Sequence, residues 1–139
     1  MTALTGLALP HARKALSVLE EASLVERRPH GRYAMHDLVR DYATTIARDL
    51  SDDVRVIALA RVMDFHLHTA HATEHLLNPH RPLPPLSSPV PGVHPYQLPD
   101  AAAAAAWLEA EHATLLATQR AAGTLGRHHV VWHLARALD

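Results

Sequence analysis

The sequence predicts a mostly α-helical protein: a truncated winged helix with a small β-hairpin wing, followed by a helical arm with a proline-rich strap. Apolar residues make up 48% of the 139 residues but aromatic residues only 4%, so alanine and leucine, which favour helix, dominate. Apolar residues also recur at helical spacing over long segments. Eight of the ten prolines lie between Pro79 and Pro99, and this stretch separates the helical segments.

The composition limits the classes of function. Thirteen Lys and Arg balance fourteen Asp and Glu, and a net charge of −1 does not favour a surface dominated by nucleic-acid or membrane binding. The absence of cysteine excludes disulfide scaffolds, thiolate metal sites and cysteine nucleophiles. No signal peptide is visible, and no apolar run reaches the roughly 20 residues of a membrane helix. We therefore expect a cytoplasmic protein with no membrane partner.

Residues 1–50 are expected to form the winged-helix domain. A helix begins at Pro10, because the missing N–H of proline costs nothing in the first turn. Residues 24–28 and 32–35 flank the turn signal Pro29-His30-Gly31 and predict the hairpin. A second helix begins at about His36. The apolar residues of the two helices are Ala12, Ala15, Leu16, Leu19, Leu38, Val39, Tyr42, Ala43 and Ile46.

Two helices and a hairpin in this combination are typical of a winged helix, which has one more helix in front. Too few residues precede Leu4 to supply that helix, so we expect a truncated domain. We also expect weak self-association, because apolar residues at both ends of the chain would lack cover. These residues are Leu4, Leu7, Leu16 and Leu19 at one end, and Val130, Val131, Leu134 and Leu138 at the other.

Residues 51–139 are expected to form the helical arm and the start of a tetratricopeptide-like region. Ser51-Asp52-Asp53 is a cap signal for a long helix at about 52–78, and Asp100 caps the next helix. Gly123 and Gly126 mark the end of that helix, and Arg127 begins a last one. The expected packing residues are Val54, Ala58, Val62, Phe65, Thr69, Ala72 and Leu76 on the long helix, and Trp107, Leu108, Leu115 and Leu116 on the next.

The proline-rich strap is the segment 79–99, which has neither alternation nor a helical period. It should be extended and partly polyproline II. We expect it to lie along the helices, anchored by Leu83, Leu86, Val93 and Tyr96.

Three stretches of sequence resemble one family. The sequence GRYAMHDLVRDYA at residues 31–43 contains the tripeptide Met35-His36-Asp37. Two more stretches lie further along the chain: LHTA at 67–70 with LLNPHRP at 76–82, and AWLEAE at 106–111 with Leu115-Leu116. Together they resemble the segment after the nucleotide-binding core of NB-ARC-type signal-transduction ATPases, the STAND class, in which the tripeptide is the MHD motif. The nearest likeness is to the actinobacterial antibiotic-regulatory (AfsR-like) type, whose ATPase module precedes tetratricopeptide repeats.

The resemblance implies a transcriptional regulator that is switched by ADP and ATP. It implies that the winged helix folds back on an upstream nucleotide-binding domain, and that His36 reaches the β-phosphate of ADP. It further implies that Asp37 holds the local backbone, that Met35 packs inward, and that DNA is contacted only through another domain. The position of His36 agrees with this role, since the free N–H groups and positive dipole end of a helix attract phosphate.

The chain lacks a phosphate-binding loop of the form G-x-x-x-x-G-K-[ST]. Cradling a nucleotide needs the backbone of that loop. We therefore expect this segment to be no enzyme and, when isolated, to bind neither ADP nor ATP measurably.

Three other interpretations of particular residues are weighed against simpler ones. Histidines at i and i+4 can face one metal ion, but no distant ligand is evident, so no metal is expected on the polar stripe of the long helix. The proline-rich strap carries a basic PxxP pattern typical of SH3 ligands, yet a spacer is favoured. A hydrolytic triad is disfavoured because no serine lies in a nucleophile-elbow context. The polar stripe is Asp64, His68, His71 and His75.

The main alternative function is a DNA-binding winged-helix domain of a transcription factor. Its recognition helix would be the helix that carries His11, Arg13 and Lys14, and Arg27, Arg28 and Arg32 would extend the basic surface onto the wing. The surplus of basic over acidic residues in this region is small for binding to phosphates, so the regulatory interpretation is preferred.

Overall fold

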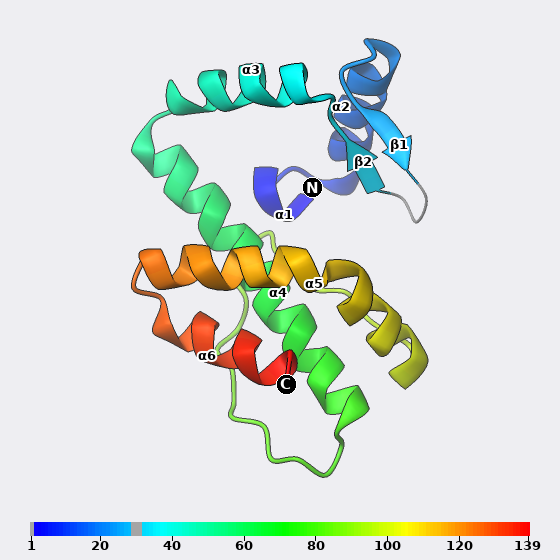
Figure 1. Cartoon of the computed structure of the whole chain (residues 1–139), viewed down its shortest axis with the longest axis vertical. Coiled ribbons are helices and arrows are strands. Elements are labelled where there is room, and N and C mark those ends of the chain that lie inside the picture. Colours follow the sequence, from blue (N-terminus) through cyan, green and yellow to red (C-terminus); the bar gives the residue numbers. More distant parts are fainter. Residues whose placement is uncertain (1, 29–31) are drawn as a thin grey trace. The chain divides into compact units, whose positions relative to one another are not determined.

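The computed structural model describes residues 2–28 and 32–139, so the predicted turn at Pro29-His30-Gly31 lies outside the described residues. The chain is mostly helical with one small antiparallel hairpin, which confirms the predicted fold class (Figure 1). It divides into two compact units, Met1–Leu59 and Ala60–Asp139. Within the described residues, no helix is both long enough and apolar enough to span a membrane.

The first unit contains a hairpin between two helices of similar length. Its β1 strand pairs antiparallel with β2, and Glu26 lies opposite Ala34. The second main helix begins directly after the hairpin, as predicted. The elements are α1 (Thr2–Thr5), α2 (Leu9–Glu21), β1 (Glu26–Arg28), β2 (Arg32–Ala34) and α3 (Asp37–Arg48).

The first unit has little apolar core of its own. Ala12 and Val25 are its buried apolar side chains among the described residues, and α3 buries none. Leu38 is 75% exposed and Tyr42 68% exposed on α3. A largely apolar hollow of about 360 Å³ opens between α2, the hairpin and α3. The prediction that the N-terminal apolar residues lack cover is confirmed for Leu4 and Leu7, which are 45% exposed each.

The second unit packs three helices around a continuous apolar core. Helix α4 (Asp52–Leu77) enters this unit from the first, and α5 (Ala101–Thr124) and α6 (His128–Ala137) follow the proline-rich strap. The positive φ of Gly126, 67°, lets the chain turn between α5 and α6, and its N–H donates to the Gly123 carbonyl. The core consists of Met63, Leu67, Ala70, Trp107, Leu115, Ala122, Val130 and Leu134.

Two predictions about this core are wrong. Val130 and Leu134 are 2% and 0% exposed, because α6 folds against α5 and contributes to the core instead of presenting an open end. The predicted inner stripe of α4 is also displaced: Thr69 is buried, but Val54 is 49% exposed. Helix α4 is covered by α5 and α6 and also by the proline-rich strap. Its buried residues therefore occupy more of the helix circumference than a single stripe would.

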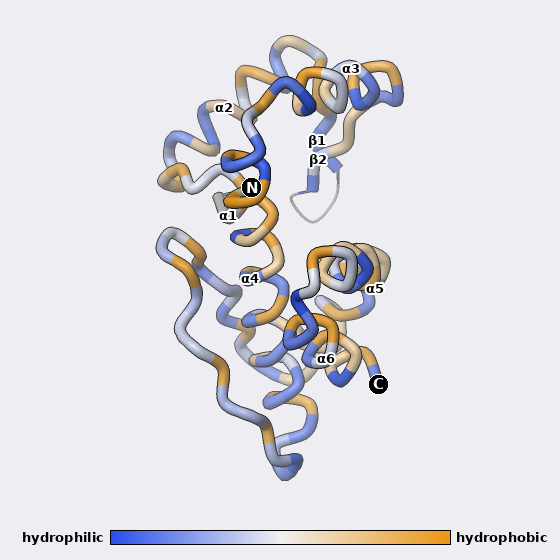
Figure 2. The backbone as a smooth tube through the Cα atoms, turned by 90° about the vertical axis from the view of Figure 1, so that its left-hand side faces the viewer, coloured by the Kyte–Doolittle hydropathy of each residue, from blue (hydrophilic) through white to orange (hydrophobic). Residues whose placement is uncertain are grey.

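The proline-rich strap is irregular and extended, as predicted (Figure 2). Its isolated apolar residues make the expected anchors in part. Val93 is buried, and Leu86 packs against the core of the second unit. Tyr96 remains 57% exposed, although its ring meets that of Phe65 edge-on at 5.2 Å between centroids.

Candidate functional site

The tripeptide Met35-His36-Asp37 lies at the junction of the hairpin and α3. Strand β2 ends at Ala34, and His36 is the N-cap residue with an extended backbone (φ −62°, ψ 147°). Its carbonyl accepts the first helical hydrogen bond, from Arg40 N–H at 2.9 Å. The His36 side chain is exposed and makes no capping hydrogen bond, so the imidazole is available to a ligand beside the N-terminus of α3.

Asp37 acts on the backbone of this junction through Arg40. Asp37 Oδ1 lies 3.4 Å from Arg40 Nη1, and Arg40 Nη2 donates to the Met35 carbonyl at 3.5 Å. One guanidinium therefore links the first turn of α3 to the residue before the cap. This arrangement agrees with a role for Asp37 in holding the local backbone, although the contact is indirect and exposed.

The structure does not show Met35 packed inward. Its side chain is 39% exposed and lines two hollows, the apolar one beside α3 and a more polar one beside His36. The apolar hollow includes side chains of α2 and α3, such as Leu19 and Val39, but it is open, so the thioether is only partly covered.

The hollow beside His36 has a volume of about 530 Å³. The hairpin forms one wall, with Glu26 and Arg28, and the start of α3 forms another, with His36 and Asp37. Arg28 is already paired with Glu26 at 2.8 Å, and Asp37 is paired with Arg40. The charges around the hollow are thus balanced rather than strongly cationic. Such a surface does not attract an anionic ligand strongly by itself, but it can add one contact to a ligand that is held elsewhere.

The wing arginines that a DNA-binding interpretation requires are engaged within the unit. Arg27 donates to the Tyr33 hydroxyl at 3.0 Å and lies 3.7 Å from Glu20. The hydroxyl of Tyr33 raises the pKa of Arg27 above its usual value, so the cation is retained. Arg28 is also paired, with Glu26, although the hairpin carries three arginines and one glutamate and so keeps a net positive charge.

The polar stripe of α4 has partners other than solvent or a metal. Asp64 Oδ2 accepts from Val90 N–H at 2.6 Å, and His71 Nε2 donates to the Pro84 carbonyl at 3.0 Å. His68 lies 3.9 Å from Asp64, while His75 is exposed. No group of three or more His, Asp or Glu within the described ranges is placed to hold a metal ion. Two of the four residues of the stripe, Asp64 and His71, therefore hold the proline-rich strap.

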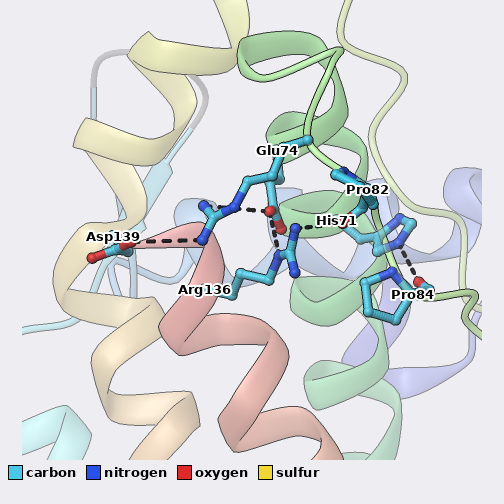
Figure 3. A network of polar contacts seen from close by, with 7 residues as sticks. His71, Glu74, Pro82, Pro84, Arg136 and Asp139 are labelled. Atoms are coloured by element: carbon cyan, nitrogen blue, oxygen red, sulfur yellow. Dashed lines mark hydrogen bonds and ion pairs between the residues drawn. The ribbon is translucent and has the colours of Figure 1, made fainter.

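A second polar centre, around Glu74, was missed by the sequence reasoning. The Glu74 side chain is only 2% exposed, and it accepts from Arg136 Nε at 2.6 Å (Figure 3). Arg81 Nη1 lies 3.6 Å from the same carboxylate. The signal in the sequence was an arginine, Arg136, within the apolar pattern of the last helix, since such a residue needs a buried anion.

The same centre holds the PxxP segment of the proline-rich strap. Arg136 Nη2 donates to the Pro82 carbonyl at 2.6 Å, and His71 donates to that of Pro84. Two carbonyls of the PxxP pattern are therefore bound within the chain. This agrees with the interpretation of the segment as a spacer rather than an SH3 ligand.

Burial affects two histidines of the second unit, His66 and His68. His66 is 7% exposed, and its Nδ1–H donates to the Thr118 hydroxyl at 2.9 Å. The Thr118 hydroxyl in turn donates to the Thr114 carbonyl. Burial lowers the pKa of His66 below its usual value. Burial also lowers the pKa of His68, against the opposing effect of Asp64.

Comparison with known proteins gives two related sequences, both named regulatory protein AfsR. The chain is 39% identical to the protein of Streptomyces griseus over 122 residues, and this alignment covers 84% of the chain. It is 35% identical to the protein of Streptomyces coelicolor over 134 residues, and this alignment covers 89% of the chain. The chain spans only 12% of the length of either relative. No family model matches the chain, and no solved structure matches it. The similarity supports a relationship with AfsR-like regulatory proteins.

Proposed function

We propose that this chain is the regulatory segment of a nucleotide-switched transcriptional regulator of the STAND class. In this proposal His36 contacts the β-phosphate of ADP that is held by a nucleotide-binding domain, and the segment links that contact to a repeat sensor. The observation that carries the proposal is the exposed His36 at the junction of the hairpin and α3, within a motif that resembles MHD. The similarity to regulatory proteins along most of the chain supports it.

The proposal assigns no catalytic step to this chain. An imidazole N–H and the first N–H groups of α3 can donate to phosphate oxygens, and this contact is lost when the phosphate moves. The nucleotide itself requires a phosphate-binding loop, which the sequence does not contain. A DNA-binding winged helix is the less supported function, because Arg27 and Arg28 are already paired within the first unit.

The test uses a chimera in which this chain replaces the aligned segment of the Streptomyces griseus protein. Transcriptional output is measured for the chimera, for its His36→Ala variant and for a matched His75→Ala variant, since His75 is an exposed histidine on α4. We expect His36→Ala to raise output and His75→Ala to leave it unchanged. Equal output from all three would contradict the proposal.

A further inference from the structure

The proline-rich strap is held by side chains from two helices of the second unit. His71 of α4 donates to the Pro84 carbonyl, and Arg136 of α6 donates to that of Pro82 (Figure 3). Asp64 and Thr69 of α4 accept from backbone N–H groups further along, at Val90 and Tyr96. Three of these four contacts therefore come from α4, and α6 adds the fourth at the PxxP segment.

Two histidine rings meet at the contact between these helices. The rings of His71 and His133 lie edge to face, with 5.9 Å between their centroids. His133 also meets the ring of Trp132, its neighbour in the sequence, at 4.9 Å between centroids. His133 Nδ1 is buried and has no hydrogen-bond partner within the described part of the chain.

This geometry suits a neutral His133 and opposes its protonation. In the neutral ring Nδ1 can carry a lone pair, whereas the imidazolium would bury an N–H without an acceptor. The nearby anion, Glu74, is already shared by Arg136 and Arg81. Burial lowers the pKa of His133, and the neighbouring His71, His129 and Arg136 lower it further. Glu74 has the opposite effect and raises the pKa.

We propose that His71 and His133 form a proton-responsive latch, which holds the proline-rich strap on α4 and α6 when neutral and releases it on acidification. Protonation of His133 places a cation near Arg136 and against the His71 ring, with one shared carboxylate to compensate the two charges. The repulsion separates α6 from α4. Because α6 supplies one of the two donors to the PxxP segment, this separation removes the contact from Arg136 to the Pro82 carbonyl and loosens the strap there.

The absence of cysteine allows the strap to be followed at a single site. Ser88→Cys, an exposed position in the strap, carries one nitroxide spin label, and its mobility is recorded by electron paramagnetic resonance between pH 7.5 and 5.0. Helix content is followed by circular dichroism in the same samples. Because the pKa of His133 is lowered, we expect a mobile component to become dominant only well below the ordinary histidine pKa of about 6.5, while helix content is retained.

Two variants assign this response to the histidine pair. His71→Gln keeps a donor for the Pro84 carbonyl, and His133→Phe keeps the ring, so we expect the double variant to lose the pH response without losing its fold. His75→Gln, on the exposed side of α4, should respond as the parent chain does. Release that persists in the double variant, or that is abolished by His68→Gln alone, would overturn the proposal. It would also be overturned if the label became mobile only as the helices unfolded.

Discussion

Replacing Arg136 by methionine should destabilise the second unit strongly, because Glu74 would then be a buried carboxylate with an incomplete partner. The Glu74 side chain is 2% exposed and that of Arg136 is 16% exposed, and they are joined at 2.6 Å. Removing one member of a buried ion pair costs about 3–5 kcal/mol. Arg81 remains 3.6 Å away and can move closer, so we expect a loss of about 3 kcal/mol, at the low end of this range.

Urea unfolding followed by tryptophan fluorescence measures this loss directly, since both tryptophans, Trp107 and Trp132, lie in the second unit. Arg120→Met, at an exposed position of α5, is the matched control and should cost less than about 0.5 kcal/mol. The double variant Arg136→Met/Glu74→Leu should be more stable than the sum of the two single losses by about 1 kcal/mol or more. Equal losses for Arg136→Met and Arg120→Met would refute the assignment of a buried pair.

Three further outcomes are expected. Leu134→Ala, at a side chain with no exposure, should lower the free energy of unfolding by about 2–5 kcal/mol in the same urea experiment, whereas Leu38→Ala on the open face of α3 should change it little. Because burial lowers the pKa of His66, the unfolded chain binds a proton at this histidine before the folded chain does, as the pH falls below about 6.5. The free energy of unfolding should therefore be highest above that pH and decrease in acid. His66→Gln should flatten this dependence in a series of urea midpoints measured between pH 7.5 and 5.5. The isolated chain should self-associate through the apolar surface of its first unit, so light scattering over a concentration series should show a mass above that of the monomer. Leu7→Glu should reduce this mass, and His75→Glu should not. A monomer mass at every concentration would contradict this prediction.

The local elements could be predicted from the sequence because their signals are local. Asp100 accepts from Ala103 N–H as a cap residue, and α5 begins where that signal placed it. The hairpin and the start of α3 at Asp37 followed from turn chemistry and apolar spacing. For the same reason the sequence placed His36 at the end of the hairpin.

The tertiary partners could not be predicted, because they are set by segments far apart in the chain. Glu74 meets Arg136 across 62 residues, and His71 is covered by a strap that has no periodic pattern. Spacing on α4 identified a polar stripe correctly, but it could not show what covers that stripe. The burial of Leu134 was likewise missed, since an amphipathic last helix has the same pattern whether it packs on α5 or awaits another element.

The rate at which ADP leaves the Streptomyces griseus chimera tests the central claim most directly. A hydrogen bond from His36 to a charged phosphate is worth about 1.5–3 kcal/mol, so its loss in His36→Ala should accelerate release of labelled ADP about tenfold or more. The His75→Ala chimera should release ADP at the rate of the unmodified chimera. Equal release rates for the His36→Ala and unmodified chimeras would contradict the role of this histidine as a sensor of the bound nucleotide.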